Sequence, residues 1–410
     1  MHEDQQFFTL SNGLRVVHQY DAGPAAHCAF IINIGSGDEK PDEHGLAHFL
    51  EHCFFKGTQK RSAYHILSRI DEVGGELNAF TSKEETAIHA SFINTYSKRS
   101  IELLCDIITN PTFPNREINK EKLVVIDEIH SYLDSPYERI FDEFEEIIFE
   151  GSSLAHNILG TPNGVMSFRA EHLRQFKDRG YTAQNTVFAY RGNMKPETLK
   201  KLLLKNLPQK LPERRVNVQD MPKANKAVHI NKKFDINQAH YISGVQAYSY
   251  HDSRYAAALL LNNILGGPGM NSRLNLNITE KLGLAYNIES QYISYAQSGL
   301  FYIYLGTDPE RLAQAVKAVH KELEKLKEKP LSSNKLELAK KQFKGQSILA
   351  AESGLNRLMA PAKSVLSFGN TEKYADVYRQ IEALTPHDLQ ITAEELFCFD
   401  AYSSLTYLPE

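Results

Sequence analysis

The sequence predicts an α+β fold with two structurally similar domains, each a mostly antiparallel β-sheet packed with helices. A chain of 410 residues is too long for one ordinary hydrophobic core, so two domains are expected. Segments with the two-residue period of strands alternate with segments that have the 3.6-residue period of helices. The order strand, strand, helix occurs in each half of the chain, which indicates an internal duplication.

In the first half, apolar and polar residues alternate on both sides of the turn Ser11-Asn12-Gly13, as expected of a β-hairpin. From Gly45 to Phe55 the apolar residues recur at helical spacing, which predicts an amphipathic helix. Further strands are predicted at 29–34, 76–81, 86–92 and 186–190, and further helices at 97–109 and from 116 to about 150.

The segment from Leu207 to Lys226 is rich in Pro, Lys, Arg, Gln and Asn, a composition typical of an exposed linker. We therefore predict a first domain over residues 1–212, a linker over 213–226 and a second domain over 227–410. In the second domain, strands are predicted at 241–245, 285–288 and 299–305, and helices at 254–265, 274–281 and 309–328.

The bulk composition is that of a globular protein, with 42% apolar and 23% charged residues. A formal net charge of −4 gives no basic surface of the kind that binds nucleic acid. No apolar run approaches the roughly 18 residues of a membrane span, and the first residues do not resemble a secretory signal. We therefore expect a cytoplasmic protein with no nucleic-acid or membrane partner. The four cysteines form no Cys-x-x-Cys pair, so any zinc site would use histidine and carboxylate ligands.

The predicted helix over 45–55 carries the motif His48-Phe49-Leu50-Glu51-His52. Two histidines four residues apart lie on one face of a helix, where both imidazoles can bind one tetrahedral metal ion. The pattern is the inverted zinc motif His-x-x-Glu-His, in which the glutamate activates a water molecule and does not bind the metal. His44 lies four residues further upstream, but it falls before the helix and is not assigned as a ligand.

A catalytic zinc site needs three protein ligands and one open position, so a third ligand must come from another segment. The helix predicted from residue 116 contains Glu121 and Glu128, which are seven residues apart and therefore nearly aligned on one helical face. Either glutamate can bind the metal while the other supports the site. Asp127 points about 100° away from Glu128.

These motifs resemble the pitrilysin family of zinc metallopeptidases, which includes insulin-degrading enzyme and mitochondrial processing peptidase. The segment from Gly45 to Thr58 is similar to the zinc-binding segment of that family. In the family, the third ligand is a glutamate about 75 to 85 residues downstream, and another glutamate precedes it by about seven residues. Here Glu128 follows His52 by 76 residues and Glu121 by 7. The resemblance covers most of the chain, in the short two-domain form of the processing peptidase subunits.

The resemblance implies a zinc-dependent endopeptidase that hydrolyses extended or unfolded peptides. One Zn²⁺ ion per chain would be held by His48, His52 and Glu128 in the first domain. Glu51 would act as the general base that activates a zinc-bound water, and Glu121, which would not bind the metal itself, would orient one of the ligands.

The resemblance also implies substrate contacts in both domains. The segment Gly74–Thr81 is similar to the active-site edge strand of the family, so Asn78 and Ala79 are expected to bind the substrate by strand addition. Tyr286 is similar to the tyrosine of an Arg and Tyr pair that contacts the substrate. The arginine of that pair usually stands seven residues earlier, where this chain has Thr279, and nothing in the sequence shows that Arg273 replaces it.

Short members of the family commonly assemble a full site from two subunits. We therefore expect a homodimer, or a heterodimer with a related subunit in which this chain supplies the metal. Two alternatives stay open: a non-proteolytic assembly subunit, and a subunit that binds zinc and peptide without turnover. The first is disfavoured because such subunits usually lose the zinc residues that this chain keeps.

Overall fold

The computed structural model describes residues 5–212, 222, 226–371 and 373–410. Within them, the chain forms two compact units, and each unit combines segments from both halves of the sequence. The first unit consists of Met1–His130, His156–Gln219 and Ala350–Tyr374, and the second of Ser131–Ala155, Asp220–Leu349 and Ala375–Glu410. None of the described helices is both long enough and apolar enough to cross a membrane.

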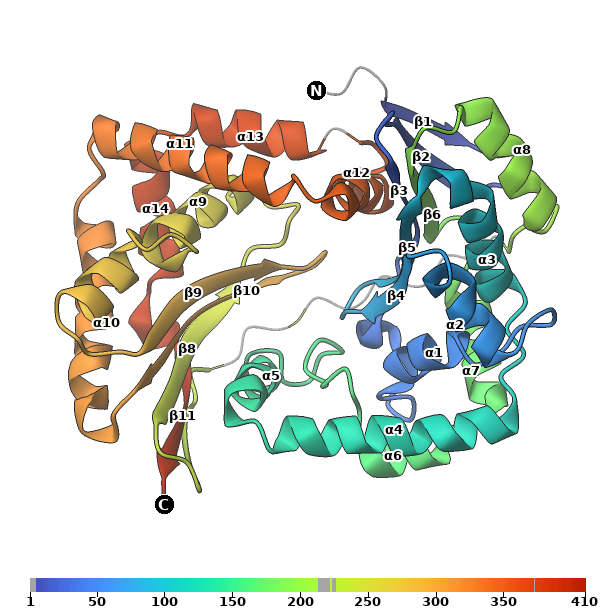
Figure 1. The fold of residues 1–410 in the computed structure, drawn as a ribbon. Coiled ribbons are helices and arrows are strands. Elements are labelled where there is room, and N and C mark those ends of the chain that lie inside the picture. Colours follow the sequence, from blue (N-terminus) through green and yellow to red (C-terminus); the bar gives the residue numbers. More distant parts are fainter. Residues whose placement is uncertain (1–4, 213–221, 223–225, 372) are drawn as a thin grey trace. The chain divides into compact units, whose positions relative to one another are not determined.

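A six-stranded sheet lies at the centre of the first unit, in the order β1-β2-β6-β3-β5-β4 (Figure 1). Strands β2 and β6 are parallel and every other neighbouring pair is antiparallel. Strand β4 therefore forms one edge of the sheet, with β5 as its paired neighbour. The strands are β1 (Gln5–Thr9), β2 (Arg15–Tyr20), β3 (Ala25–Ile32), β4 (Glu76–Thr81), β5 (Thr86–Ile93) and β6 (Thr186–Gly192).

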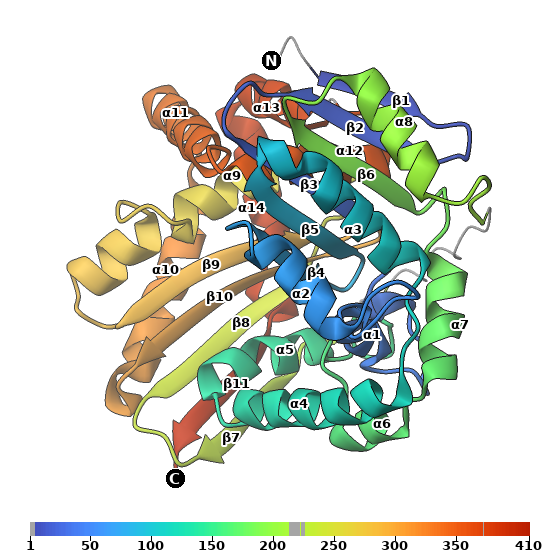
Figure 2. The same cartoon turned by 45° about the vertical axis from the view of Figure 1, so that its right-hand side comes forward.

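The two faces of this sheet have separate hydrophobic cores, because alternate residues of a strand point to opposite faces. Cys28 and Phe30 of β3 belong to the larger core, which includes α1 and α3, whereas Ala29 and Ile31 pack against α12. Helices α3 and α12 accordingly lie on opposite sides of the sheet (Figures 1 and 2). The helices of the unit are α1 (Leu46–Phe54), α2 (Ala63–Asp71), α3 (Ser97–Thr109), α4 (Asn115–Leu133), α6 (Pro162–Ser167), α7 (Ala170–Gly180), α8 (Pro196–Asn206) and α12 (Gly354–Phe368).

The second unit repeats this plan around a five-stranded sheet of order β7-β11-β8-β10-β9, in which only the β11–β7 pair is parallel. Phe301 and Ile303 of β10 face a core with α9, α10 and α14, while Leu300 and Tyr302 face α5. The strands are β7 (His229–Phe234), β8 (Ala239–Ala247), β9 (Asn287–Ser294), β10 (Gly299–Thr307) and β11 (Ser403–Pro409). The helices are α5 (Pro136–Ile148), α9 (Tyr255–Gly266), a π-helical turn (Asn275–Glu280), α10 (Leu312–Glu328), α11 (Ser333–Ala350), α13 (Lys373–Ala383) and α14 (Pro386–Leu396).

The predicted α+β class, with mostly antiparallel sheets in two similar domains, is confirmed. The predicted linker lies almost wholly outside the described residues, and the division into residues 1–212 and 227–410 stays a prediction. The compact units nevertheless do not correspond to a single division of the chain into two consecutive parts. Residues 131–155 belong with the second sheet, and residues 350–374 belong with the first. The physical reason is burial, because α5 and α12 each cover an apolar face of a sheet built mainly from the other half of the chain.

Candidate metal centre

Helix α1 is fixed in place by its apolar face and by its first turn. Its apolar side chains, including Leu46 and Phe49, are fully buried. The buried carboxylate of Glu39 accepts hydrogen bonds from the backbone N–H groups of Gly45 (3.0 Å) and Ala47 (2.6 Å), which have no acceptor within the helix. Gly45 adopts a left-handed conformation with φ of 93°, which favours glycine at this position. These contacts fix the orientation of α1 at its first turn, which precedes His48 and His52 in the sequence.

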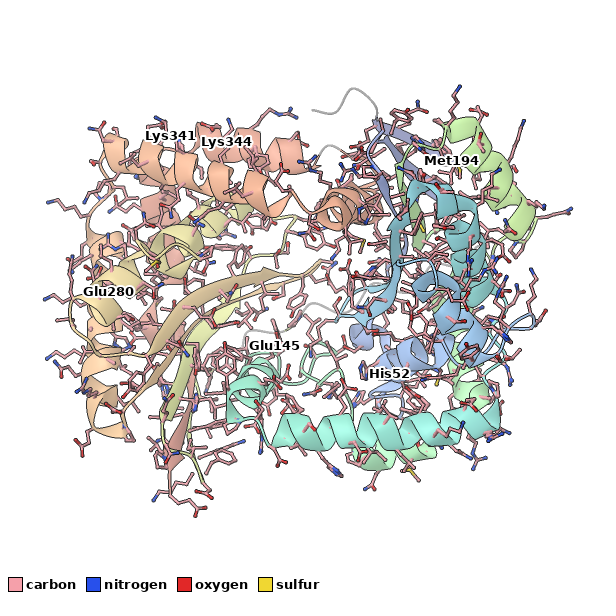
Figure 3. The ribbon with its side chains drawn as sticks, in the orientation of Figure 1. His52, Glu145, Met194, Glu280, Lys341 and Lys344 are labelled. Carbon is pink, nitrogen blue, oxygen red and sulfur yellow. The ribbon has the colours of Figure 1, made fainter. Side chains whose placement is uncertain are left out.

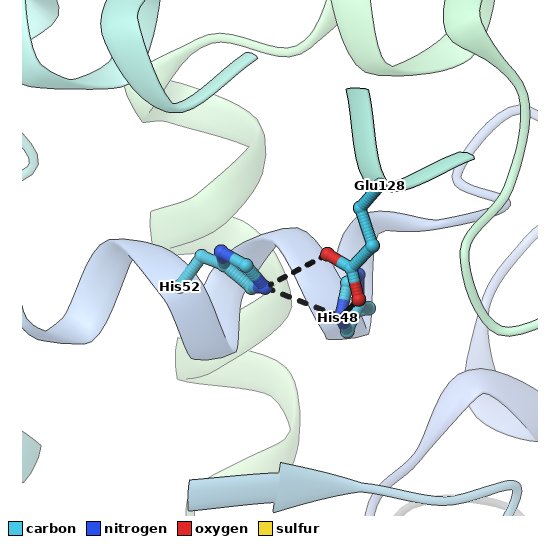
Figure 4. A group of neighbouring side chains, drawn as sticks. All are labelled: His48, His52 and Glu128. Atoms are coloured by element: carbon cyan, nitrogen blue, oxygen red, sulfur yellow. Dashed lines mark hydrogen bonds and ion pairs between the residues drawn. The ribbon is translucent and has the colours of Figure 1, made fainter. Parts of the chain in front are cut away.

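Two histidines of α1 and one glutamate of α4 converge (Figure 4). The Nε2 atoms of His48 and His52 lie 3.2 Å apart. The carboxylate of Glu128 lies 3.7 Å from Nε2 of His48 and 3.5 Å from Nε2 of His52. One ligand atom from each of the three residues lies within 4.8 Å of the other two. These are the three residues that the sequence predicts as metal ligands, and the structure brings them together.

Glu121 lies on the other side of the His52 ring from this group. Its Oε1 atom is 2.9 Å from Nδ1 of His52, and its Oε2 atom is 2.7 Å from Nζ of Lys56. Burial raises the pKa of Glu121, but the contacts with His52 and Lys56 outweigh it and hold the pKa below its usual value. The geometry therefore separates the two glutamates that helical spacing alone leaves equivalent. Glu128 faces both Nε2 atoms, and Glu121 faces Nδ1.

The electrostatics of the three-residue group fit a bound cation. Burial lowers the pKa of His48 to about 4, so this imidazole is neutral at pH 7 and offers a lone pair. Burial also lowers the pKa of His52, but Glu121 and Glu128 outweigh it, so that the pKa is raised overall. The carboxylates therefore stabilise positive charge beside His52. Two imidazole nitrogens and one carboxylate are also one of the donor sets found in catalytic zinc sites.

Glu51 lies beside the ligand group without belonging to it. Its Oε2 atom is buried and has no hydrogen-bond partner among the described residues. Burial raises the pKa of Glu51, and the nearby Thr81 hydroxyl and His52 only partly oppose this effect. A carboxyl group with a raised pKa next to a metal site is suited to accept and return a proton.

The predicted substrate residues Asn78 and Ala79 lie on the edge strand β4, opposite His89 and Ile88 of β5. The side-chain oxygen of Asn78 accepts a hydrogen bond from the backbone N–H of Ala79 (2.8 Å). Within the described part of the chain, β4 pairs with a strand on one side only. The other edge of β4 can therefore accept an extended peptide.

The predicted substrate residue Tyr286 lies in the second unit and is 58% exposed. Its hydroxyl group donates a hydrogen bond to Asp308 (2.8 Å). Arg273 is held by Glu322, at 3.0 and 3.2 Å, and Thr279 lies in the π-helical turn with a buried hydroxyl. The guanidinium group of Arg273 is thus already engaged within the second unit.

Glu39 and Lys56 support the site from outside the motif, and neither residue is predicted from the sequence. Lys56 stands inside the segment that resembles the family, four residues after His52 and just beyond the end of α1 at Phe54, so this short separation could have indicated a contact near that histidine. Glu39 had no such signal, because its hydrogen bonds depend on the turn between residues 39 and 45.

The chain matches known protein families over most of its length. Residues 15–162 match the family described as Insulinase (Peptidase family M16), and residues 167–343 match the Peptidase M16 inactive domain. The chain therefore belongs to the M16 family of peptidases, which confirms the resemblance seen in the sequence. The His-x-x-Glu-His motif and Glu128 both lie inside the first match.

The individual relatives are similar over nearly their whole length. An uncharacterized zinc protease of Bacillus subtilis, YmxG, is 32% identical, with 96% of each chain covered. An uncharacterized zinc protease of Streptomyces coelicolor is also 32% identical, with 95% of this chain and 86% of the relative covered. Among solved structures, a protease from Helicobacter pylori has a TM-score of 0.91 and 22% identity, with 99% of this chain and 100% of that chain covered. A peptidase M16 inactive domain from Pseudomonas fluorescens has the same TM-score at 19% identity, with 99% and 98% covered. Both structures support the two-domain α+β fold.

Proposed function

We propose that this protein is a zinc-dependent endopeptidase that hydrolyses extended or unfolded peptides. The observation that carries the proposal is the convergence of His48, His52 and Glu128 beside a buried, unpartnered carboxyl oxygen of Glu51. The names of the related zinc proteases support the same activity.

The chain itself supplies the binding and proton-transfer steps. An extended peptide adds to the open edge of β4, where Asn78 and Ala79 bind it through the backbone. Glu51 accepts a proton from the attacking water and later delivers it to the leaving amine. Glu121 holds the His52 ring so that its Nε2 atom faces His48 and Glu128. When bound, zinc lowers the pKa of a water ligand towards about 7 and polarises the scissile carbonyl group.

The decisive experiment compares wild type with Glu51→Gln in a fluorogenic peptide assay, together with measurement of bound zinc. We expect Glu51→Gln to lose about 10²- to 10⁴-fold in kcat while it keeps one zinc ion per chain. A chelator should inactivate the wild type, and added zinc should restore it. A Glu51→Gln protein that retains full activity contradicts the assignment.

A second candidate function is zinc and peptide binding without turnover by the isolated chain. The observation that favours it is the absence of an arginine at Thr279 together with the Arg273–Glu322 pair. In this case the chain is the metal-bearing subunit of a heterodimer, and a related subunit provides the arginine. Activity that appears only when such a subunit is added supports this candidate, whereas equal activity of the purified chain alone contradicts it. The cytoplasmic location and the homodimeric alternative stay predictions.

A further inference from the structure

Helix α12 covers the face of the first sheet opposite the metal-bearing helix, although it comes from the last quarter of the sequence. It contacts β2, β3 and β6 and lies outside both segments that match the M16 family descriptions, 15–162 and 167–343. In Figures 1 and 2 it runs beside these strands. Its buried residues on this face are Leu358, Met359, Ala362 and Val365.

One charged residue of this helix, Lys363, reaches the substrate strand and its turn. The Nζ atom of Lys363 forms an ion pair with Glu85, in the turn between β4 and β5. The same atom lies over the ring of Phe80, 5.1 Å from its centroid. Glu85 is largely shielded, since 19% of its side chain is exposed, so water screens this ion pair less than a surface pair. Lys363 therefore contacts both the end of β4 and the turn that follows it.

The opposite face of β4 is directed towards the metal-bearing helix. Phe80 packs with the α12 core, while Leu77 and Ala79 pack with the core that includes α1. Thr81 follows the same alternation as Leu77 and Ala79, so its side chain lies on the same face of β4 as theirs. A shift of β4 therefore changes the position of its open edge and of Thr81 together.

We propose that Lys363 is a positioning residue that holds β4 in the place where it binds substrate. An edge strand has one hydrogen-bonded neighbour, so it moves more easily than an internal strand unless other contacts restrain it. Lys363 provides such a restraint from a distant part of the chain. This inference rests on the proposed function, because it assigns Lys363 to the strand that receives the peptide.

The test uses the full-length, zinc-loaded protein and four variants. Lys363→Met removes the charge and keeps the length of the side chain, Lys363→Arg keeps the charge, and Glu85→Gln removes the partner. The matched control is Lys344→Met on α11, labelled in Figure 3, which removes a more exposed ion pair with Glu382 (3.9 Å) in the second unit. Each protein is assayed for KM and kcat with a long fluorogenic peptide and for hydrogen exchange over residues 76–93.

Lys363→Met and Glu85→Gln should each raise KM about fivefold, leave kcat within about twofold, and speed up exchange in β4. Lys363→Arg should restore the wild-type KM, and Lys344→Met should change neither measurement. The proposal is overturned if Lys363→Met and Glu85→Gln leave KM and exchange unchanged, or if Lys344→Met has the same effect as Lys363→Met. If Lys363→Met does not fold, Glu85→Gln decides the outcome.

Failure of the proposed function gives a different result. If the wild type hydrolyses no peptide even with a related subunit, the peptidase assignment falls. The role of Lys363 is then judged from the dissociation constant of the same peptide and from exchange in β4. Unchanged values in both measurements overturn the positioning role on their own.

Discussion

The Nδ1 atom of His52 lies 2.9 Å from Oε1 of Glu121, and the second oxygen of Glu121 lies 2.7 Å from Nζ of Lys56. Both oxygens of Glu121 are therefore engaged, and the His52 ring is held with Nε2 towards His48 and Glu128. The contact connects α4 to α1 through a residue that does not belong to the three-residue metal group.

From this contact, we predict that Glu121→Gln weakens zinc binding by about 10- to 100-fold, because loss of a carboxylate partner frees the ring and makes the imidazole a weaker ligand. Competition with a chromophoric chelator measures the affinity. Glu117→Gln is the control, because Glu117 lies one turn earlier on α4 and pairs with Lys120. Equal zinc affinity in wild type and Glu121→Gln would show that the contact is dispensable.

Metal removal should also lower thermal stability. A ligand that binds only the native state at 100 times its Kd stabilises that state by about 2.7 kcal/mol, so a chelator should lower the Tm of the wild type. His48→Ala should abolish this shift, because it removes one of the three ligands. The exposed His65 on α2 gives the control variant His65→Ala, which should keep the full shift. A chelator-induced shift in His48→Ala equal to that in wild type would place the metal elsewhere.

Gly45→Ala should destabilise the start of the metal-bearing helix. Gly45 has φ of 93°, and a Cβ atom there would lie 2.8 Å from the carbonyl oxygen of Leu159. We expect a loss of about 1 to 3 kcal/mol in the free energy of unfolding, with weaker zinc binding. Gly345→Ala within α11 is the opposite case, since a Cβ atom there meets nothing within 4 Å. This substitution should raise the free energy of unfolding by about 0.5 to 1 kcal/mol. Urea denaturation measures both, and a Gly45→Ala protein as stable as wild type contradicts the strain.

The buried Asp106 should make stability depend on acid pH. Burial raises its pKa, but hydrogen bonds from Thr58, Asn110 and Arg61 outweigh this and hold the pKa below its usual value. Since the pKa of Asp106 is lower in the folded state, its carboxylate stabilises the folded state, and this stabilisation is complete above the unfolded pKa of about 3.9. It is lost as the pH falls through the folded value.

Asp106→Asn should therefore cost about 2 to 3 kcal/mol at pH 7 and flatten the stability profile between about pH 5 and pH 2. Denaturant titrations over this range measure the profile. Asp178→Asn, at a position whose side chain is 76% exposed, should change stability little. A profile for Asp106→Asn that stays parallel to that of wild type would exclude this origin of the pH dependence.

Local periodicity predicts the elements around the site well. The helix predicted at 97–109 and the strand predicted at 76–81 have the observed bounds. Where tertiary contacts or a single residue determine the bounds of an element, the predicted bounds are less accurate. The long helix expected from 116 to about 150 is two helices, because Pro136 cannot continue the first and instead begins α5. The strand expected at 285–288 is instead β9, Asn287–Ser294, whose bounds follow its pairing with β10.

The site shows the same limit. Motif spacing identifies His48, His52 and Glu128 as candidate ligands because helical geometry is local. The family resemblance indicates that Glu128, and not Glu121, is the third ligand. Lys363 could not be found this way, since 278 residues separate it from Glu85 and no periodicity links them. Contacts of this kind depend on how the chain returns to the first sheet, which the local sequence does not determine.

The return of α12 to the first sheet has a consequence during synthesis. Until residues 354–368 leave the ribosome, the apolar surface formed by Val17, Ala29, Ile31, Ala87, Val187 and Ala189 has no helix to cover it. The unit that bears the metal group begins first and is completed late, whereas domains generally fold as they emerge. This sheet is therefore complete but uncovered from the synthesis of β6, which ends at Gly192, until α12 begins at Gly354.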